Sequence, residues 1–397
     1  MSAAPAVSTV TAPLAYPPSL HGEVYARAVD ARDPHFDGVF FVGITTTRVY
    51  CRPICPSRRA NNDHRRFFDS AAAAERAGFR PCLRCRPELA PGRAVLGMVS
   101  RLAHAAVQRI AAGVLNGRSV ADLARELGVS ERHLRRTFEH EMGVSPLELA
   151  RTQRLLLAKR LLVDSDFTVT RVAYASGFQS LRRFNAAFRE QYGMPPSALR
   201  RAPPPRRVPD AADVLRLTLA YRAPFAWDAL LDSLRAGATP GVDIVVGRRY
   251  GRTVRFDDHR GVVVAEDGSG HVIVEVSAGL VPVLMPLIAG LRRVFDLDAE
   301  PAAVDAHLAL CGLGALVARR PGVRIPGALA GFDVAFRALL GGRGRSGHAT
   351  CALVRRVATT LGEPVATGVP GLTHLAPPPA RVAEVGATRL QALGVPP

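Results

Sequence analysis

The sequence has little lysine and no long apolar run. Among its 52 Lys and Arg residues, only Lys159 is a lysine. The longest apolar run, 276–291, is interrupted by Gly279, Pro282 and Pro286, so it is too short and too broken to cross a bilayer. Residues 1–20 contain no Lys or Arg, which excludes the positively charged start of a secretory signal peptide. These absences predict a cytoplasmic protein without a membrane partner, in which disulfides are not the default state of the six cysteines.

The chain nevertheless carries a strong positive charge. A net charge of +18 over 397 residues indicates a polyanionic partner, nucleic acid first of all. The abundance of Arg, Ala, Pro and Gly is also typical of coding bias, which would spread the charge evenly. Instead residues 93–207 carry +11, whereas 1–92 carry +4 and 208–397 carry +3. The uneven charge favours nucleic-acid binding by the middle of the chain, and the length predicts several domains.

Four cysteines form two short-spaced pairs. Cys51 and Cys55 lie in Cys-Arg-Pro-Ile-Cys, and Cys82 and Cys85 lie in Cys-Leu-Arg-Cys, with 26 residues between the pairs. Such pairs can each occupy a tight turn and together supply four thiolates to one zinc ion. The alternative, four ordinary buried cysteines, accounts less well for the clustering.

Three other candidate metal ligands are interpreted as structural residues. Cys311 and Cys351 lie in apolar, helix-like surroundings and are expected to be small core residues. His64 is expected at the surface, because the four cysteines already complete a tetrahedral set.

The segments that contain the cysteine pairs, 36–42, 45–56 and 77–87, closely resemble the N-terminal domain of the Ada methylation-response regulators. The similarity runs from about Tyr25 to Glu88. It implies that Cys51 accepts a methyl group irreversibly from a methylphosphotriester in DNA, with the other three cysteines as the remaining zinc ligands. The chemistry is sensible, because a metal-bound thiolate is a nucleophile at neutral pH and the loss of its charge reduces repulsion from DNA. Three flanking arginines are candidate phosphate contacts or solvated surface residues: Arg52, Arg58 and Arg80.

The middle of the chain contains two similar helical patterns, 119–138 and 168–188. In each, apolar residues recur at helical spacing up to a glycine, Gly128 or Gly177, and a second amphipathic helix follows. This is the pattern of a helix-turn-helix, and a long helix over 146–162 is predicted between the two units.

The whole segment resembles the two-unit DNA-binding domain of AraC-type regulators, which places two recognition helices in successive major grooves. Arg side chains suit guanine edges, and Asn or Gln suits adenine. For some of the candidates the alternative is a solvated helix face. The candidates are Glu131, Arg132, Arg135, Arg136, Gln179, Ser180, Arg182, Arg183 and Asn185.

A Pro-rich linker leads into a third region with alternating strand patterns. The patterns fall at 215–219, 252–256, 261–265 and 271–276, and helices are expected from about Glu300 onward. From about Val214 to its end the chain resembles the AlkA branch of alkyladenine DNA glycosylases.

Two departures from that branch bear on activity. The helix-hairpin-helix and catalytic Asp of those enzymes lie beyond the family position at which this sequence stops, and the glycine-rich run 341–347 falls where the family has a regular helix. The Gly-Leu-Gly run at 312–314 lies too early to be the hairpin, and Asp333 has no supporting motif as a glycosidic catalyst. We therefore expect a partial helical domain with exposed apolar surface.

Together these features predict a multidomain α+β protein. It comprises a small zinc-bound α/β domain, an all-α double helix-turn-helix domain, and an α+β AlkA-like domain followed by a partial all-α glycosylase domain. The expected boundaries are a disordered tail at 1–20, then 21–92, 93–201, a linker at 202–210, 211–297 and 298–397.

The predicted function is a single-turnover methyl acceptor that, once methylated, activates alkylation-repair genes. Double-stranded DNA is the expected partner, RNA polymerase a further one, and the protein is expected to be a monomer with one Zn²⁺. No Pro-Cys-His-Arg run is present, so no second acceptor cysteine is expected. The alternatives are a 3-methyladenine DNA glycosylase and a zinc-stabilised AraC-type transcription factor without methyl transfer.

Overall fold

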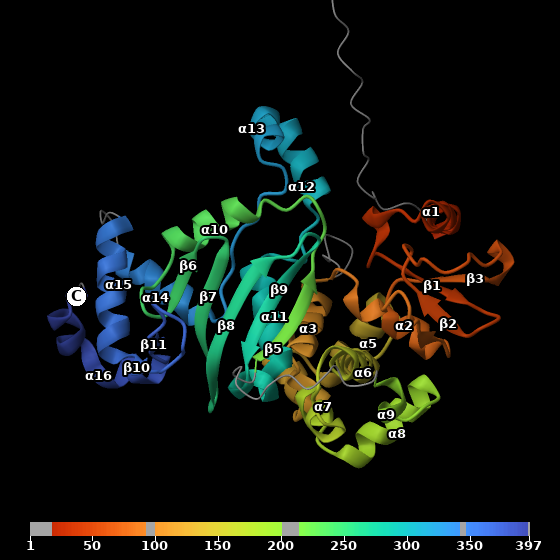
Figure 1. The fold of residues 1–397 in the computed structure, drawn as a ribbon, viewed down its shortest axis with the longest axis horizontal. Helices are drawn as coiled ribbons and strands as arrows, with labels where there is room; N and C mark the ends of the chain where they lie inside the picture. The colour runs from red at the N-terminus through yellow and green to blue at the C-terminus, as the bar shows by residue number, and fades with distance from the viewer. Residues whose placement is uncertain (1–17, 93–99, 201–213, 342–346, 396–397) are drawn as a thin grey trace, which may run out of the picture.

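The computed structural model describes residues 18–92, 100–200, 214–341 and 347–395. Most of the predicted N-terminal tail, the predicted linker and positions 342–346 of the glycine-rich run lie outside these residues. Three units follow one another along the chain (Figure 1): a small sheet with short helices, a helical unit, and a larger sheet with helices. The predicted fold class is confirmed, although α1 (Pro18–Ala31) already begins inside the segment predicted as tail.

The first unit is built on a four-stranded sheet with the order β3-β1-β2-β4. β1 pairs antiparallel with β2 and β3, while β2 pairs parallel with β4. Helix α2 (Ala71–Arg76) is capped by Ser70, whose side chain accepts the N–H of Ala73. The ring of Tyr25 in α1 stacks on Phe40 at 4.0 Å. The strands are β1 (Phe41–Ile44), β2 (Val49–Cys51), β3 (Arg65–Phe68) and β4 (Arg80–Pro81).

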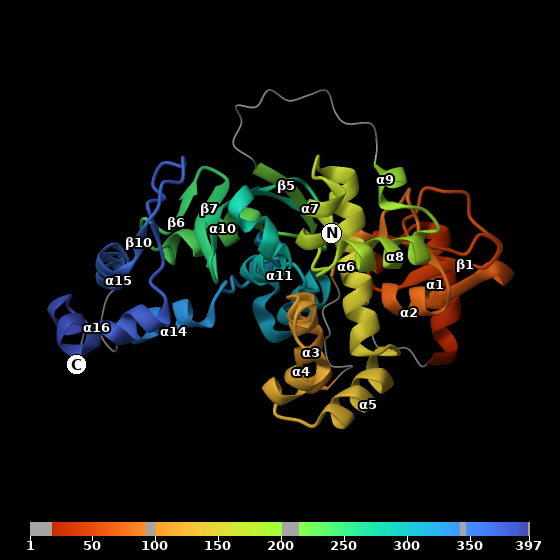
Figure 2. The ribbon, with the colours of Figure 1, turned by 90° about the horizontal axis from the view of Figure 1, so that it is seen from below.

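The second unit contains two helix-turn-helix pairs on either side of the long helix α6 (Pro146–Asp164). In Figure 2 the pair α4–α5 lies at one end of α6, and α8 lies beside its other half. The helices are α3 (Arg101–Ala111), α4 (Val120–Glu126), α5 (Glu131–Met142), α7 (Val169–Ala175), α8 (Leu181–Tyr192) and α9 (Pro196–Leu199). The predicted long helix is thus confirmed and ends two residues later than expected.

The two recognition helices, α5 and α8, have the same kind of caps at both ends and bury equivalent side chains. Each begins after a serine whose side chain accepts a main-chain N–H, and each ends at a glycine, Gly143 or Gly193, with φ of 68° or 69°. That left-handed conformation is costly for residues with a Cβ. Phe138 and Phe188 occupy equivalent positions and are fully buried. The shared capping and packing explain why both sequence patterns fold as the same unit.

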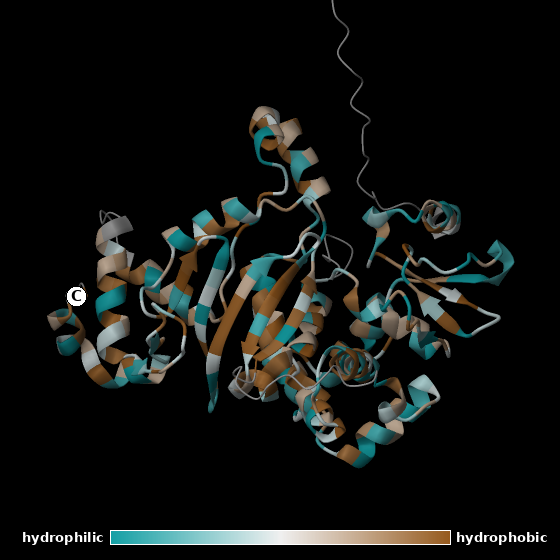
Figure 3. Cartoon of the chain, in the orientation of Figure 1, coloured by the Kyte–Doolittle hydropathy of each residue, from teal (hydrophilic) through white to brown (hydrophobic). Residues whose placement is uncertain are grey.

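The third unit is a five-stranded antiparallel sheet with the order β5-β9-β8-β7-β6. Alternate residues of β5 are buried, as the sequence pattern predicted, and Figure 3 shows the apolar stripes along the sheet. Four of the strands were predicted, and the short β6 was not. The elements are β5 (Val214–Ala220), α10 (Trp227–Ala236), β6 (Asp243–Val246), β7 (Arg249–Phe256), β8 (His259–Asp267), β9 (His271–Ser277) and α11 (Leu284–Val294).

The segment after residue 300 is mostly helical and exposes apolar side chains, as expected, although its two short strands were not predicted. Leu310, Ile325 and Leu339 are 88%, 80% and 74% exposed. The elements are α12 (Pro301–Leu308), α13 (Gly314–Arg319), α14 (Gly331–Gly341), α15 (Gly347–Leu361), β10 (Glu363–Pro364), β11 (His374–Leu375) and α16 (Pro379–Ala392).

Helices α12 and α13 project from the body of the molecule (Figure 1). By length and composition, Pro301–Arg319 is the one helical segment of the described residues able to cross a membrane, and 6% of its apolar window is buried. Gly312 interrupts it with a φ of 86°. Because this segment projects outward, Cys311 is exposed, and its prediction as a core residue was wrong; Cys351 is half-buried.

The third unit packs directly on the helical unit. One hydrophobic cluster contains Leu155 and Leu161 of α6 together with Leu217 and Val274 of the large sheet. The buried Arg160 of α6 also donates to a main-chain carbonyl of β5. Helix α6 therefore lies at the centre of the molecule and contacts both other units.

Candidate metal and DNA-binding site

The four predicted cysteines lie together at one edge of the small sheet. Cys51 ends β2 and Cys82 follows β4, and the parallel pairing of these strands places the two cysteines side by side. Cys55 and Cys85 follow in the two turns. All four sulfur atoms lie within 4.8 Å of one another, and only Cys55 is not buried. A tetrahedral zinc site with Zn–S bonds of about 2.3 Å has sulfurs about 3.8 Å apart, so this set fits the metal.

Main-chain amides point at two of the sulfurs. The N–H of Arg52 donates to Cys85 Sγ, and the N–H of Arg84 donates to Cys82 Sγ, both at 3.4 Å. Among the described residues, no main-chain N–H is assigned to Cys51 Sγ. Without a metal ion, hydrogen bonds with Cys51 and the other cysteines lower the pKa of Cys55, whereas hydrogen bonds with Cys55 and the other cysteines raise the pKa of Cys51. The four thiols therefore do not all ionise on their own, and a bound metal ion would supply the positive charge that keeps Cys51 deprotonated. The sulfurs also differ in the donors they accept.

The three arginines predicted to hold phosphates differ in their surroundings. Arg52 is largely buried: its guanidinium pairs with Asp37, and its Nη1 donates to the Cys85 carbonyl at 3.2 Å. Arg58 is exposed and Arg80 is half-buried. Arg52 therefore stabilises the turn that contains Cys85. Phosphate contacts by these three arginines stay a prediction.

The predicted DNA-reading residues lie at the N-terminal halves of α5 and α8. Arg132, Arg136, Arg182 and Arg183 are exposed, as is Gln179, which precedes α8.

Four further candidates have intramolecular partners or partial burial. Arg135 and Glu131 form an ion pair at 2.5 Å, so the charges of these two candidates are already paired within α5. The side chain of Ser180 caps α8, and Asn185 is half-buried. Their contacts with DNA also stay predictions.

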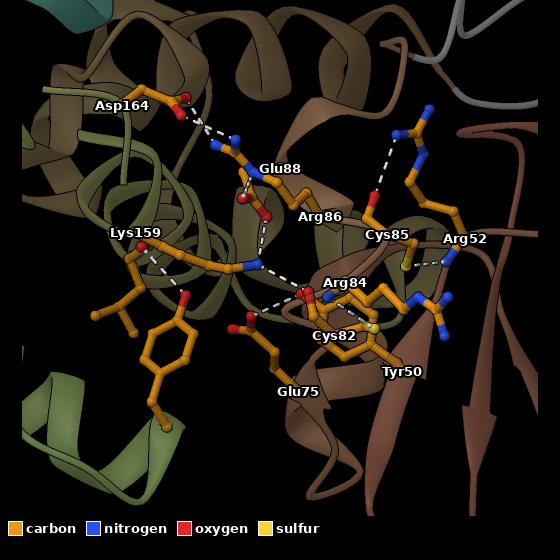
Figure 4. Close-up of polar contacts among 12 residues, drawn as sticks. Tyr50, Arg52, Glu75, Cys82, Arg84, Cys85, Arg86, Glu88, Lys159 and Asp164 are labelled. Atoms are coloured by element: carbon orange, nitrogen blue, oxygen red, sulfur yellow. Dashed lines mark hydrogen bonds and ion pairs between the residues drawn. The ribbon is translucent and has the colours of Figure 1, made fainter. Parts of the chain in front are cut away.

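Sequence reasoning missed a polar network between the cysteine site and α6. Figure 4 shows Lys159 reaching from α6 to the carbonyl of Cys82 and to Glu88. The available signal was the single lysine in a chain whose other basic residues are all arginine.

Three family models match the chain. The metal-binding domain of Ada matches residues 24–88, a helix-turn-helix domain matches 123–202, and the AlkA N-terminal domain matches 216–330. A "probable bifunctional transcriptional activator/DNA repair enzyme AlkA" of Mycobacterium tuberculosis is 37% identical over 362 residues, which are 90% of this chain and 73% of that protein. The chain belongs to this family of bifunctional transcriptional activator/DNA repair enzymes.

Two further similarities cover parts of the chain. The bifunctional transcriptional activator/DNA repair enzyme Ada of Escherichia coli is 30% identical over 168 residues, 42% of this chain and 46% of that protein. The structure of the DNA methyl phosphotriester repair domain of Escherichia coli Ada is 39% identical over 19% of this chain and 80% of that chain, with a TM-score of 0.18.

Membership of the family assigns the main features of the chain. It is a DNA repair enzyme and a transcriptional activator that binds DNA through its helix-turn-helix domain. Its four cysteines form a zinc site within the metal-binding domain. The sheet of the third unit is an AlkA N-terminal domain.

Proposed function

We propose that Cys51 accepts a methyl group from a methylphosphotriester in DNA, once per molecule. The thiolate sulfur attacks the methyl carbon, so a sulfur–carbon bond forms while the carbon–oxygen bond of the ester breaks. The leaving group is the ordinary phosphodiester anion, and no proton is transferred. Because the product is a stable thioether, the step is irreversible and the protein does not turn over.

The choice of Cys51 among the four cysteines is supported by the hydrogen bonds at the sulfurs. A donated N–H withdraws charge from a thiolate and makes it a poorer nucleophile. Cys82 and Cys85 each accept a main-chain N–H, whereas none is assigned to Cys51 among the described residues. Cys55 is the more exposed sulfur, so exposure alone favours it. The main-chain donors therefore disfavour Cys82 and Cys85, and a side-chain hydrogen bond from Ser57 to Cys55 disfavours Cys55 in the same way. Cys51 is thus the proposed acceptor, and Cys55 is the competitor that the experiment must exclude.

The four cysteines would hold the zinc ion. When bound, zinc keeps the sulfurs deprotonated at neutral pH and leaves the site with a charge of about −2. Methylation turns the Cys51 thiolate into a neutral thioether, so the chain carries one negative charge less at a surface that faces DNA. Repulsion from the phosphate backbone falls. The methylated protein is thus expected to bind its promoter more tightly and to activate repair genes.

The DNA-bound protein uses both recognition helices. The exposed Arg132 and Arg136 of α5 and Arg182 and Arg183 of α8 suit base edges and phosphates. Binding as a monomer, with both helices in one site, and recruitment of RNA polymerase complete the proposal. Promoter binding implies a cytoplasmic location.

Glycosylase activity is the second candidate, because the AlkA N-terminal domain matches residues 216–330. Asp333, the acid considered from sequence, forms an ion pair with Arg252. An acid held by an arginine is poorly placed to support a departing cationic base. We therefore propose methyl transfer, and not base excision, as the repair reaction of this chain.

Intact-protein mass spectrometry after incubation with excess DNA that carries methylphosphotriesters tests the proposal. The zinc-loaded chain should gain one methyl group and no more, and the DNA should release no free 3-methyladenine. A chain that stays unmethylated while binding DNA is a zinc-stabilised transcription factor. A chain that releases base repeatedly is a glycosylase.

A further inference from the structure

Lys159 is the only lysine of the chain, and 1% of its side chain is exposed. A buried ammonium group is costly unless charged and polar partners surround it. Here Nζ donates to the carbonyl oxygen of Cys82 at 2.9 Å and pairs with Glu88 Oε2 at 2.6 Å (Figure 4). The middle of α6 is therefore fastened to a residue that forms the zinc site.

The network continues from Glu88 to the end of α6. The carboxylate of Glu88 is 2% exposed, and its second oxygen accepts Arg86 Nε at 2.9 Å. The other two nitrogens of Arg86 reach both oxygens of Asp164, at 2.8 and 2.7 Å. Arg86 has a φ of 53°, a left-handed conformation that non-glycine residues adopt only under constraint. The cysteine turn is thus fixed to α6 at two points, Lys159 and Asp164.

Two further polar contacts join the same units. Thr152 of α6 donates to Glu75 Oε2 at 2.6 Å, and Gln191 at the end of α8 donates to the Phe79 carbonyl at 3.1 Å. Thr152, Lys159 and Asp164 span about 18 Å of helix at 1.5 Å per residue. Contacts spread over that length restrict rotation of the first unit about α6.

Helix α6 also holds both recognition helices. Leu149 belongs to the hydrophobic cluster of the first helix-turn-helix, together with Phe138 of α5. Leu155 belongs to the cluster of the second, together with Phe188 of α8. A displacement of the cysteine turn relative to α6 therefore changes the position of the methyl-acceptor site relative to both DNA-reading helices.

Resting on the methyl transfer proposed above, we infer that Lys159 is a positioning residue that couples the zinc site to promoter recognition. By holding the Cys82 carbonyl and Glu88 against α6, it keeps the cysteine site and both recognition helices in one rigid arrangement. A chain that binds DNA through pre-arranged units does not have to order them on binding. The whole gain in DNA affinity that methylation produces at the cysteine site then contributes to promoter binding.

The double variant Lys159→Met with Glu88→Gln tests the coupling. It removes both buried charges together, which proteins tolerate better than the loss of one partner, and the amide oxygen introduced by Glu88→Gln can still accept from Arg86. The probe is the duplex that the methylated wild-type protein selects from a random-sequence pool. Methyl uptake should stay within about twofold of wild type, whereas the ratio of promoter affinity after and before methylation should fall from the range of about 5- to 150-fold to below about twofold.

The matched control removes a second ion pair of the first unit that does not reach α6. In Arg65→Met with Asp30→Asn, a pair at 2.9 Å is lost. This control should keep the wild-type affinity ratio. A folded Lys159/Glu88 variant that also keeps the wild-type ratio overturns the coupling, because a merely structural role would leave that ratio unchanged.

Hydrogen exchange on the wild-type chain tests the coupling without a variant and without methyl transfer. Loading the metal-free protein with zinc should slow exchange of the amides around Lys159 in α6. Unchanged exchange there overturns the coupling. If zinc loading slows exchange in α6 but no methyl is taken up, the coupling stands and the proposed methyl transfer fails.

Discussion

The carboxylate of Glu75 accepts a hydrogen bond from Thr152 at 2.6 Å, across the boundary between the cysteine unit and α6. Its other oxygen accepts the Tyr50 hydroxyl at 3.0 Å, one residue before Cys51. This acid therefore connects the strand that ends at the zinc site to the helix between the two helix-turn-helix pairs.

Glu75 should make stability depend on pH. Burial raises its pKa from 4.5 to about 7, despite the hydrogen bonds from Thr152 and Tyr50. Because the folded state holds this proton more tightly, the associated stability is complete below about pH 4.5 and is lost as pH rises through about 7, by at most about 3 kcal/mol. Urea unfolding of the zinc-loaded protein between pH 5 and 8 measures most of this decline. Glu75→Gln should flatten the decline, and an equally steep decline in that variant would contradict the assignment.

Removal of zinc should unfold the first unit. Cys51, Cys82 and Cys85 belong to its hydrophobic cluster with Phe40 and Val42, so the metal-binding residues are also core residues. Structural zinc sites contribute folding free energy directly. Addition of a chelator should abolish the near-ultraviolet circular dichroism of the aromatic cluster, and zinc should restore it. A signal that persists after chelation shows that the unit folds without the metal.

Phe188→Ala should destabilise the second helix-turn-helix. Its ring is fully buried and stacks on Tyr192 with centroids 4.3 Å apart. Loss of a core phenylalanine costs about 3–5 kcal/mol, whereas replacement of the neighbouring exposed Arg189 by Ala should change stability by less than about 0.5 kcal/mol. Chemical denaturation of both variants compares them. Equal stabilities would show that Phe188 is not part of a packed core.

Arg182→Ala should weaken binding to the selected promoter duplex. Arg182 is exposed near the start of α8 and is placed for contact with DNA. If Arg182 contacts a phosphate, its loss should lower affinity for all sequences and reduce the slope of log affinity against log salt concentration by about one. If it contacts a base, its loss should cost about 1–3 kcal/mol of binding free energy and relax specificity at one position. Arg248→Ala, at an exposed arginine of the third unit, is the control. Identical binding by both variants would remove Arg182 from the interface.

The local patterns of the sequence predicted much of this molecule. The paired cysteines indicated a zinc site because short spacing and tight turns bring ligands together without knowledge of the remaining fold. The helix-turn-helix units were equally predictable, since apolar residues at helical spacing, including Phe138 and Phe188, and the turn glycines Gly128 and Gly177 lie within one short segment of each unit. Strand alternation indicated four of the five strands of the large sheet.

The parts that escaped prediction depend on contacts between distant segments. The Lys159–Glu88 pair joins residues 71 positions apart, and no local pattern indicates that partnership. Arg52 sits beside Cys51 as a phosphate ligand would, but Asp37, fifteen positions earlier, holds its guanidinium. Cys311 has apolar neighbours in sequence, yet its helices project from the body and leave it exposed.

Peptide mass spectrometry of the methylated protein tests the central claim most directly. The zinc-loaded wild-type chain and the variants Cys51→Ser and Cys55→Ser are each incubated with DNA that carries methylphosphotriesters. The methyl group should lie on the wild-type peptide that contains Cys51 and should be absent from Cys51→Ser, in a protein shown to retain its fold. A methyl group on Cys55, or on any residue of folded Cys51→Ser, contradicts the assignment of Cys51 as the acceptor.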